Sequence, residues 1–200
     1  MAGLSVHTAE TAYAVTQAEI KAWNKIDSSD DDTVVALIER AVHNWAREYT
    51  SRSLTAVTYT LNIDAIYDTD IPIQEGTYIG IDQDINRRSI LLPKSPVSSV
   101  THIKYYDDSD SATTYATSNY YVDTVSVPAR IVLRNGSSWP TGLRVANALE
   151  IRYIAGYGAT TAVPYDIKSA CLEYSAYLFE HRGDLLNGSR VLAPTSATQL

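Results

Sequence analysis

The order of the hydrophobic patterns along this chain constrains its fold more than any other feature. Apolar residues recur at the helical period near both ends, whereas residues 54–157 are rich in Val, Ile, Thr and Tyr, with Pro, Gly, Asn and Asp between the runs. The first pattern predicts helices and the second predicts strands. Because helices and strands are segregated, the sequence predicts an α+β fold, a helical bundle from both chain ends with an inserted antiparallel β domain.

The same patterns predict where each part begins and ends. We expect a helical layer from residues 16–53 and 159–186, and a β-rich insert over residues 54–158. Residues 1–15 show no convincing hydrophobic period, and residues 187–200 are mostly small and polar. These two segments are therefore predicted to be a flexible N-terminal arm and a mobile C-terminal tail.

Three helices are expected, each with a recognisable start. Thr16, followed three residues later by Glu19, has the spacing of a capping box. A run of aspartates ending at Asp32 favours the N-terminus of the second helix, and Pro164 suits the first turn of the third.

The second helix has the clearest apolar stripe, and that stripe leaves His43 on the polar side. We expect it to pack against the third helix, with each large buried side chain contributing about 1.5–3 kcal/mol. The predicted core residues are Leu37, Ile38, Trp45, Ile167, Tyr174 and Leu178.

Short runs of β-forming residues separated by turn residues predict the strands. They cover residues 55–63, 78–81, 89–92, 97–106, 113–115, 120–123, 129–133 and 149–153. The dipeptide Asn135-Gly136 is a strong turn signal. The chain has 15 Tyr against 1 Phe, which suits either half-buried strand positions or partly wet interfaces.

Composition excludes several functions. The net charge is −7, and an acidic chain does not recruit nucleic acid through phosphate neutralisation. Its single cysteine, Cys171, rules out an intrachain disulfide framework and lies in the apolar stripe of the third helix, so we expect it to be inert. No stretch approaches the roughly 20 apolar residues of a membrane span, and no secretion signal is evident.

A search for reactive groups finds no catalytic or metal-binding pattern. The histidines His7, His43, His102 and His181 lack metal-ligand spacing. Residues 156–158, Gly-Tyr-Gly, complete no phosphate-binding loop, and the acidic stretches 27–32 and 107–110 lack the alternating ligands of a calcium loop. We therefore expect no catalytic residues, no cofactor and no metal.

Several collinear segments together resemble one family. They are TQAEIKAWNKID and ALIERAVHNWAREYTSRSL near the start, LPKSPVSSVTHIKYYD and YYVDTVSVPARIVLRNGSSWP in the middle, and ALEIRYIAGYG followed by VPYDIKSACLEYSAYLFEHRGD. The more specific pieces are residues 130–140 and the strand-to-helix junction at residues 153–167. Over residues 16–184 the chain resembles the head–tail connector, or adaptor, proteins of tailed bacteriophages.

The resemblance implies a structural protein of the virion neck, assembled in the host cytoplasm. Such proteins form a ring of about twelve copies beneath the portal. The ring extends the DNA channel, through which DNA passes without specific binding, and offers a platform for the next neck or tail protein. The partners implied are the chain itself, the portal and that next protein, with no membrane involved.

Two residue sets carry hypotheses about these contacts. The tail is expected to order on the portal, because it has too few apolar residues to fold alone. Its candidate contacts are Asn187, Gly188, Arg190, Val191, Leu192, Pro194 and Leu200. The acidic balance suits a channel wall that does not retain DNA, and the candidate channel residues are Asp107, Asp108 and Asp110.

Other functions remain open on the sequence alone. One is a different ring protein of the neck or tail, such as a head-closure or tail-terminator subunit. Another is a β-scaffold module that binds a ligand through its tyrosines, although such a module would not need the flanking helices. An enzyme would need a converging nucleophile and base, and the sequence shows neither.

Overall fold

The computed structural model describes residues 2–64 and 88–181, and these contain three α-helices and eight β-strands. The fold is α+β, as the segregated patterns predicted, and all strand pairs are antiparallel. The chain divides into two compact units. Among the described residues, the β unit comprises 2–10, 56–64 and 88–156, and the helical unit comprises 11–55 and 157–181.

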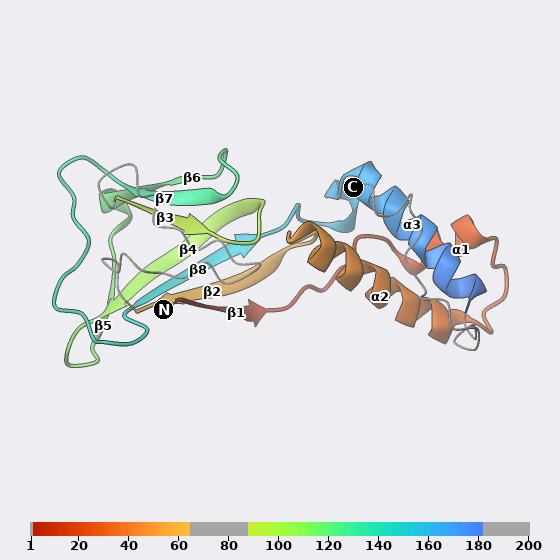
Figure 1. Ribbon diagram of the computed structural model, residues 1–200, viewed down its shortest axis with the longest axis horizontal. Helices are drawn as coiled ribbons and strands as arrows, with labels where there is room; N and C mark the ends of the chain where they lie inside the picture. Colours follow the sequence, from red (N-terminus) through yellow and green to blue (C-terminus); the bar gives the residue numbers. More distant parts are fainter. Residues whose placement is uncertain (1, 65–87, 182–200) are drawn as a thin grey trace, which may run out of the picture. The chain divides into compact units, whose positions relative to one another are not determined.

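The β unit contains two sheets (Figure 1). The larger has the strand order β1-β2-β8-β4-β5 and the smaller has the order β3-β7-β6. The strands are β1 (Ala2–Thr8), β2 (Val57–Ile63), β3 (Ser89–Leu92), β4 (Val97–Tyr106), β5 (Ala112–Thr114), β6 (Tyr120–Asp123), β7 (Ala129–Leu133) and β8 (Leu149–Ala155). Seven of these strands lie at or within about two residues of predicted runs, whereas the predicted strand at 78–81 lies outside the described residues.

One core lies between the two sheets of the β unit. Alternate residues of β8, namely Leu149, Ile151, Tyr153 and Ala155, face it, and so does Ile131 of β7. Residues of both sheets belong to the same cluster, as expected for two antiparallel sheets packed face to face. Several tyrosines supply core volume there: Tyr59, Tyr115, Tyr120 and Tyr153 are all buried.

The prediction of a flexible arm over residues 1–15 is wrong for the first part of that segment. Residues 2–8 form β1, which pairs with β2 from Ala2↔Ile63 to Thr8↔Thr58. Leu4 packs against the core of the β unit. The β domain is therefore not a simple insert, because the N-terminal segment supplies its outermost described strand beside β2.

The helical unit contains α1 (Gln17–Asn24), α2 (Asp32–Thr50) and α3 (Tyr165–Glu180), and each helix contacts the other two. The capping box is confirmed. Thr16 Oγ1 accepts a hydrogen bond from the Glu19 backbone N–H (3.2 Å), and Glu19 Oε2 accepts one from the Thr16 backbone N–H (2.8 Å). Two left-handed residues, Lys25 and Ser51, cap the C-termini of α1 and α2.

The core of the helical unit includes most of the residues expected there. Ile38 and Ile167 are buried in it, and Trp45, Tyr174 and Leu178 pack against it. The Trp45 and Tyr174 ring centroids lie 4.8 Å apart.

Leu37 is an error in that predicted set, because it is 63% exposed. The buried stripe of α2 runs through Val35, Ile38, Val42 and Ala46. Leu37 lies two residues after Val35, about 200° around the helix, which places it on the opposite face.

His43 also differs from the prediction, because it is buried and not on a polar surface. Its Nδ1 accepts a hydrogen bond from the backbone N–H of Ala14 (3.0 Å). Two further bonds hold the same segment, from Thr160 Oγ1 to the Tyr13 carbonyl (2.7 Å) and from Thr55 Oγ1 to the Ala12 carbonyl (2.8 Å). The second half of the predicted arm is thus packed into the helical unit.

Candidate functional site

The candidate sites in the described part of the chain are interaction surfaces. Among residues 2–64 and 88–181, no group of three or more His, Cys, Asp or Glu side chains could hold a metal ion. Cys171 is fully buried, and burial raises the pKa of its thiol to about 12, so the reactive thiolate is scarce near neutral pH. No described helix is long and apolar enough to cross a bilayer.

The first surface is a hollow of about 590 Å³ in the helical unit. We call it the aromatic hollow. It is lined by Tyr49, Thr50, Arg52, Tyr157, Pro164, Asp166 and Ile167. Tyr49 is half-exposed and stacks on Trp45, with ring centroids 5.6 Å apart. The next residue after Pro164, Tyr165, is also exposed. Exposed aromatic rings of this kind are enriched at protein interfaces.

Local structure fixes the shape of the aromatic hollow. The end of α2 supplies Tyr49 and Thr50, and the left-handed residue Ser51 turns the chain there. The Tyr157 backbone N–H donates to the Leu54 carbonyl (3.3 Å), and Arg52 Nη1 donates to the Tyr157 hydroxyl (2.9 Å). The tyrosine is thus held in place before any partner arrives, which reduces the entropy lost on binding.

The second surface is the turn between β6 and β7, residues 124–128, which we call the valine loop. Val125 is 91% exposed and Val127 is 69% exposed. Asp123 holds the loop: its Oδ1 accepts from the backbone N–H groups of Val125 (3.1 Å) and Ser126 (3.2 Å), and its Oδ2 accepts from the Ser126 hydroxyl (2.7 Å). Two apolar side chains are therefore presented to solvent by an ordered turn.

The charge of Asp123 is part of that arrangement. The Ser126 hydroxyl, the Arg130 guanidinium and nearby backbone N–H groups lower the pKa of this carboxyl to about 2. Arg130 Nε lies 2.9 Å from Asp123 Oδ2. Asp123 consequently stays ionised, and keeps accepting these bonds, at any pH the protein meets near neutrality.

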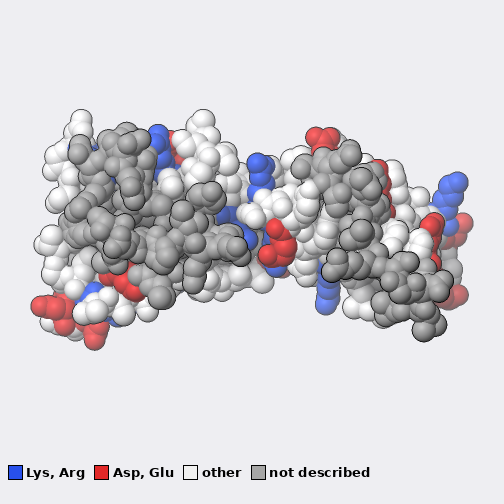
Figure 2. Space-filling model, in the orientation of Figure 1, with Lys and Arg blue, Asp and Glu red and all other residues white. Residues whose placement is uncertain are grey.

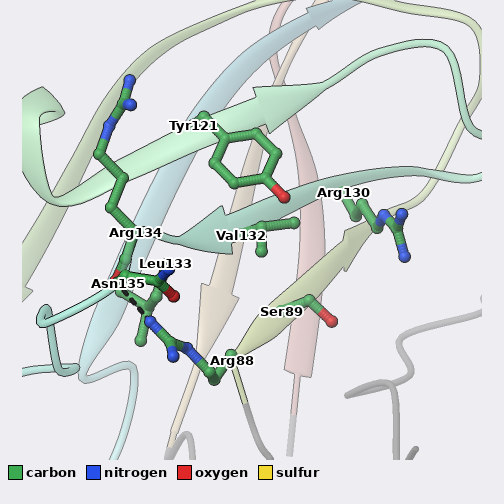
Figure 3. Close-up of a pocket in the computed structure, with 8 residues that line it drawn as sticks. All are labelled: Arg88, Ser89, Tyr121, Arg130, Val132, Leu133, Arg134 and Asn135. Carbon is green, nitrogen blue, oxygen red and sulfur yellow. Dashed lines mark hydrogen bonds between the residues drawn. The ribbon is translucent and has the colours of Figure 1, made fainter. Parts of the chain in front are cut away.

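The third surface is a hollow of about 450 Å³ on the outer face of the smaller sheet, which we call the arginine hollow (Figure 3). Ser89, Val132 and Tyr121 form one row across β3, β7 and β6. Arg88, Arg130 and Arg134 lie around this row. Arg88, which precedes β3, is thus brought to the same hollow as Arg130 and Arg134 of the β7 segment, although the sequence showed no basic run.

Each arginine of that hollow already has a local partner. Arg88 donates to the Arg134 carbonyl, Arg134 Nε donates to the Tyr120 carbonyl (3.1 Å), and Arg130 pairs with Asp123. In Figure 3 the Arg130 and Arg134 side chains extend away from the row of Tyr121 and Val132. The three guanidinium groups therefore do not converge on one point, and the hollow is not a closed anion site.

A polar network joins β4 to β8 in the larger sheet. Glu150 Oε1 lies 3.0 Å from His102 Nε2 and 3.2 Å from Arg152 Nη2, and Glu150 Oε2 accepts from the Tyr106 hydroxyl (3.2 Å). Burial would raise the pKa of Glu150, but the hydrogen bonds from His102 and Tyr106 and the Arg152 charge lower it overall. This network binds neighbouring strands, although the buried Nε of Arg152 has no hydrogen-bond partner.

The three predicted channel aspartates lie together on the turn between β4 and β5. Asp107 Oδ1 accepts from the backbone N–H groups of Ser109 and Ser111, both at 2.9 Å. Asp110 pairs with Arg144 Nη1 (3.4 Å), and both Asp108 and Asp110 are exposed. In Figure 2 acidic side chains gather at the lower left, at the end of the β unit where Figure 1 places β5. Of the three carboxylates, that of Asp107 therefore holds the turn itself.

The tail residues expected to contact the portal lie outside the described part of the chain. These are Asn187, Gly188, Arg190, Val191, Leu192, Pro194 and Leu200. The valine loop and the aromatic hollow were not predicted. The signal that could have found the loop is the pair of valines in a turn otherwise made of Thr, Ser and Pro.

Comparison with known proteins finds similarity of structure alone. No protein-family model matches the sequence, and no curated protein matches it. Among solved structures, a chain titled "Neck of empty GTA particle computed with C6 symmetry" matches with TM-score 0.70 and 19% identity, over 98% of this chain and 93% of that one.

Two further solved chains have the same fold, where GTA stands for gene transfer agent. One, from the virion of a native GTA particle, has TM-score 0.68 and 19% identity, covering 94% of this chain and 88% of that one. The other, from the neck of a native GTA particle computed with C12 symmetry, has TM-score 0.63 and 18% identity, covering 98% and 92%. The chain therefore shares the fold of these particle chains along nearly its whole length.

Proposed function

We propose that this chain is a structural neck protein of a tailed-phage-like particle, and more specifically a head–tail connector, or adaptor. Copies of it form a ring of about twelve beneath the portal. The ring extends the DNA channel and provides a platform for the next neck or tail protein. It acts by binding, without catalysis, in the neck of the virion, after assembly in the host cytoplasm.

The observation that carries this proposal is the fold shared with neck chains over 98% of this chain and 93% of one of those chains. A match that covers both chains almost completely includes the β unit and the helical unit together. The sequence resemblance to connector proteins, drawn from collinear segments, points to the same role.

Within this proposal, the acidic turn at Asp107, Asp108 and Asp110 faces the channel. Acidic walls repel the phosphate backbone and let DNA slide past, whereas clustered basic residues would retain it. Asp108 and Asp110 are better candidates than Asp107, because both are exposed, whereas the Asp107 carboxylate accepts two bonds within the turn. The tail, residues 187–200, reaches the portal and orders there.

The main rival is another ring protein of the neck or tail, such as a head-closure or tail-terminator subunit. No specific feature of the structure favours this alternative. Such a protein would also form a ring and would also lie in the virion. A β-scaffold ligand-binding module is a weaker rival, because the hollow in the β unit is open and its arginines have local partners.

Sedimentation of the purified chain with capsids tests the proposal. We expect the full chain to bind capsids that carry the portal and not matched capsids that lack it. Deleting residues 187–200 should abolish binding while circular dichroism stays unchanged, and a chain with the same tail residues in scrambled order is the control. Binding to both kinds of capsid, or to neither, would contradict the adaptor role. Loss of the tail without loss of binding would refute its part in docking.

A further inference from the structure

We infer that the free chain is a symmetric dimer, in which the outer edge of β1 pairs with the outer edge of β1 from a second copy. The pairing is antiparallel about a twofold axis and centres on Leu4. A twofold contact does not belong to a ring with cyclic symmetry around a channel. The dimer is therefore the state of the chain before assembly, and only this placement in time rests on the proposed function.

β1 is an open edge of the larger sheet. Among residues 2–64 and 88–181, β2 is the only strand that pairs with it. Its seven residues, AGLSVHT, include no Asp, Glu, Lys, Arg or Pro. The other sheet edges are shorter, since β5 has three residues and β3 and β6 have four each. Proteins usually protect an open edge by short length, charge or proline, so the long uncharged edge of β1 points to a strand partner.

The register of the larger sheet fixes the direction of its backbone groups. The Tyr106 N–H donates to the Ala148 carbonyl (2.9 Å), and the Ser98 hydroxyl donates to the Ile154 carbonyl (3.1 Å). The even-numbered residues of β8 therefore bond to β4. Because backbone groups alternate in direction along a strand, the odd-numbered residues of β8 bond to β2. This leaves the even-numbered residues of β2 to bond to β1.

The same alternation shows which groups of β1 point outward. Gly3 and Ser5 are the register partners of even-numbered residues of β2, so their backbone groups point into the sheet. The Ser5 hydroxyl donates to the carbonyl of its own partner in β2 (3.3 Å), which agrees with that direction. The backbone groups of Ala2, Leu4 and Val6 consequently point away from the sheet. A register shift after Val6 limits regular pairing to these first residues.

The apolar side chains of β1 are incompletely covered at this edge. Leu4 and Val6 lie opposite Leu61 and Tyr59, which belong to the core of the β unit. Leu4 packs against that core, but Val6 is 52% exposed. The apolar row of the sheet thus continues to an edge that no described strand covers. A partner must supply an extended backbone and apolar side chains on the same face.

A second copy of β1 meets both needs. An antiparallel pair centred on Leu4 sets Leu4 opposite itself and Ala2 opposite Val6. All of these residues point outward, so the pair forms about six backbone hydrogen bonds. Ala2 of the second copy then covers Val6. No charged side chains meet across the axis, because β1 has none of Asp, Glu, Lys or Arg. Gly3 leaves room for the approach, since a Cβ atom there would meet nothing within 4 Å.

A disulfide test reads the register directly. In this pairing Gly3 lies opposite Ser5 of the second copy at a position without backbone hydrogen bonds. The Cα atoms there are about 4.5 Å apart, which a disulfide can bridge. Gly3→Cys chain is mixed with Ser5→Cys chain under mild oxidation. We expect linked dimers from the mixture and far fewer from either variant alone, whose cysteines lie on a diagonal. The native Cys171 is buried and its pKa is raised to about 12, so it gives a quiet background.

Mass in solution tests the edge itself. Sedimentation of the wild-type chain should give twice the 22.0 kDa of one copy. Val6→Pro removes an outward N–H and leaves the bonds to β2 in place. The twofold axis places this change twice in each interface, so we expect the dissociation constant of the dimer to rise by about tenfold or more. Val6→Thr is the matched control, because it keeps the N–H and a β-branched side chain, and it should stay dimeric. Circular dichroism should be unchanged in both variants.

Three results would overturn the inference. The wild-type chain could sediment as a monomer. The dimer could withstand Val6→Pro, or either cysteine variant alone could cross-link as well as the mixture. None of these results affects the proposed function, which is tested by ring formation on portal. A dimer with this register that never forms rings on portal would contradict the proposed function and leave the β1 contact standing.

Discussion

Replacing His43 is the sharpest test of how the helical unit is held together. His43 Nδ1 is the acceptor for the buried Ala14 N–H, and its ring meets Tyr13 edge-on with centroids 5.3 Å apart. In His43→Ala the N–H loses its acceptor in a buried place, which costs about 1–3 kcal/mol. Loss of the ring contact adds about 0.5–1.5 kcal/mol. We expect the free energy of unfolding to fall by about 2–4 kcal/mol in all.

His43→Asn is the matched control, because its side-chain oxygen can stand where Nδ1 stands. It loses only the ring contact, so we expect a loss of about 1 kcal/mol. Urea unfolding followed by the helical circular-dichroism signal measures both variants, since all the described α-helices lie in the helical unit. Hydrogen exchange of the peptide spanning residues 11–16 should speed up in His43→Ala and much less in His43→Asn. Equal stability of the two variants would refute the account, as would an unchanged exchange rate.

Three further predictions concern single side chains. Ile38→Ala should lower the free energy of unfolding by about 2–5 kcal/mol, because it leaves a cavity at a buried site. Leu37→Ala, on the exposed face of α2, should lower it by less than about 0.5 kcal/mol. Equal losses for the two variants in urea unfolding would contradict the structure. The bond from Lys168 Nζ to Glu19 Oε1 (2.7 Å), together with the Thr16 bonds, outweighs burial and lowers the pKa of Glu19 below its ordinary 4.5. The ionised Glu19 stabilises the folded state by under about 1 kcal/mol, because this side chain is partly exposed. This stabilisation should be complete above pH 4.5 and should be lost as the pH falls through the lowered pKa of Glu19. A Lys168→Met variant whose stability keeps the same dependence on acid pH would argue against this. Asp123→Asn should speed hydrogen exchange at Val125 and Ser126 at neutral pH, while Asp108→Asn should not; no difference between the two would show that Asp123 does not order the loop.

The elements with strong local signals were predictable from the sequence. The capping box at Thr16 and Glu19, the alternation in β8 and the turn at Asn135-Gly136 each depend on residues a few positions apart. The structure contains all three, with Gly136 at a φ of 81°. Local periodicity is sufficient there because burial and backbone angles act on the same short segment.

The predictions that were wrong concern residues whose structure depends on segments far away in the sequence. Residues 2–8 read as an arm because a short strand is stable only against its partner, and β2 begins 55 or so positions later. His43 was assigned to the polar face because its buried partner, Ala14, lies 29 residues away. Leu37 was included in the core because the apolar residues of α2 fit more than one stripe, and only α1 and α3 decide which stripe is covered.

Interaction surfaces are harder to predict than cores, for a physical reason. Val125 and Val127 belong to no recognisable sequence motif. They form a candidate surface only because they are exposed and because Asp123 orders the turn that holds them. The arginine hollow joins Arg88, Arg130 and Arg134 only because β3 pairs with β7. Neither surface can be recognised until the strand register is known.

Imaging of the purified chain bound to isolated portal tests the central claim most directly. Averaged side and end views should show a closed ring of about twelve copies, coaxial with the portal and open along the axis. A chain that stays monomeric on the portal, or that binds away from its axis, would contradict the claim that this protein is the ring joining head to tail.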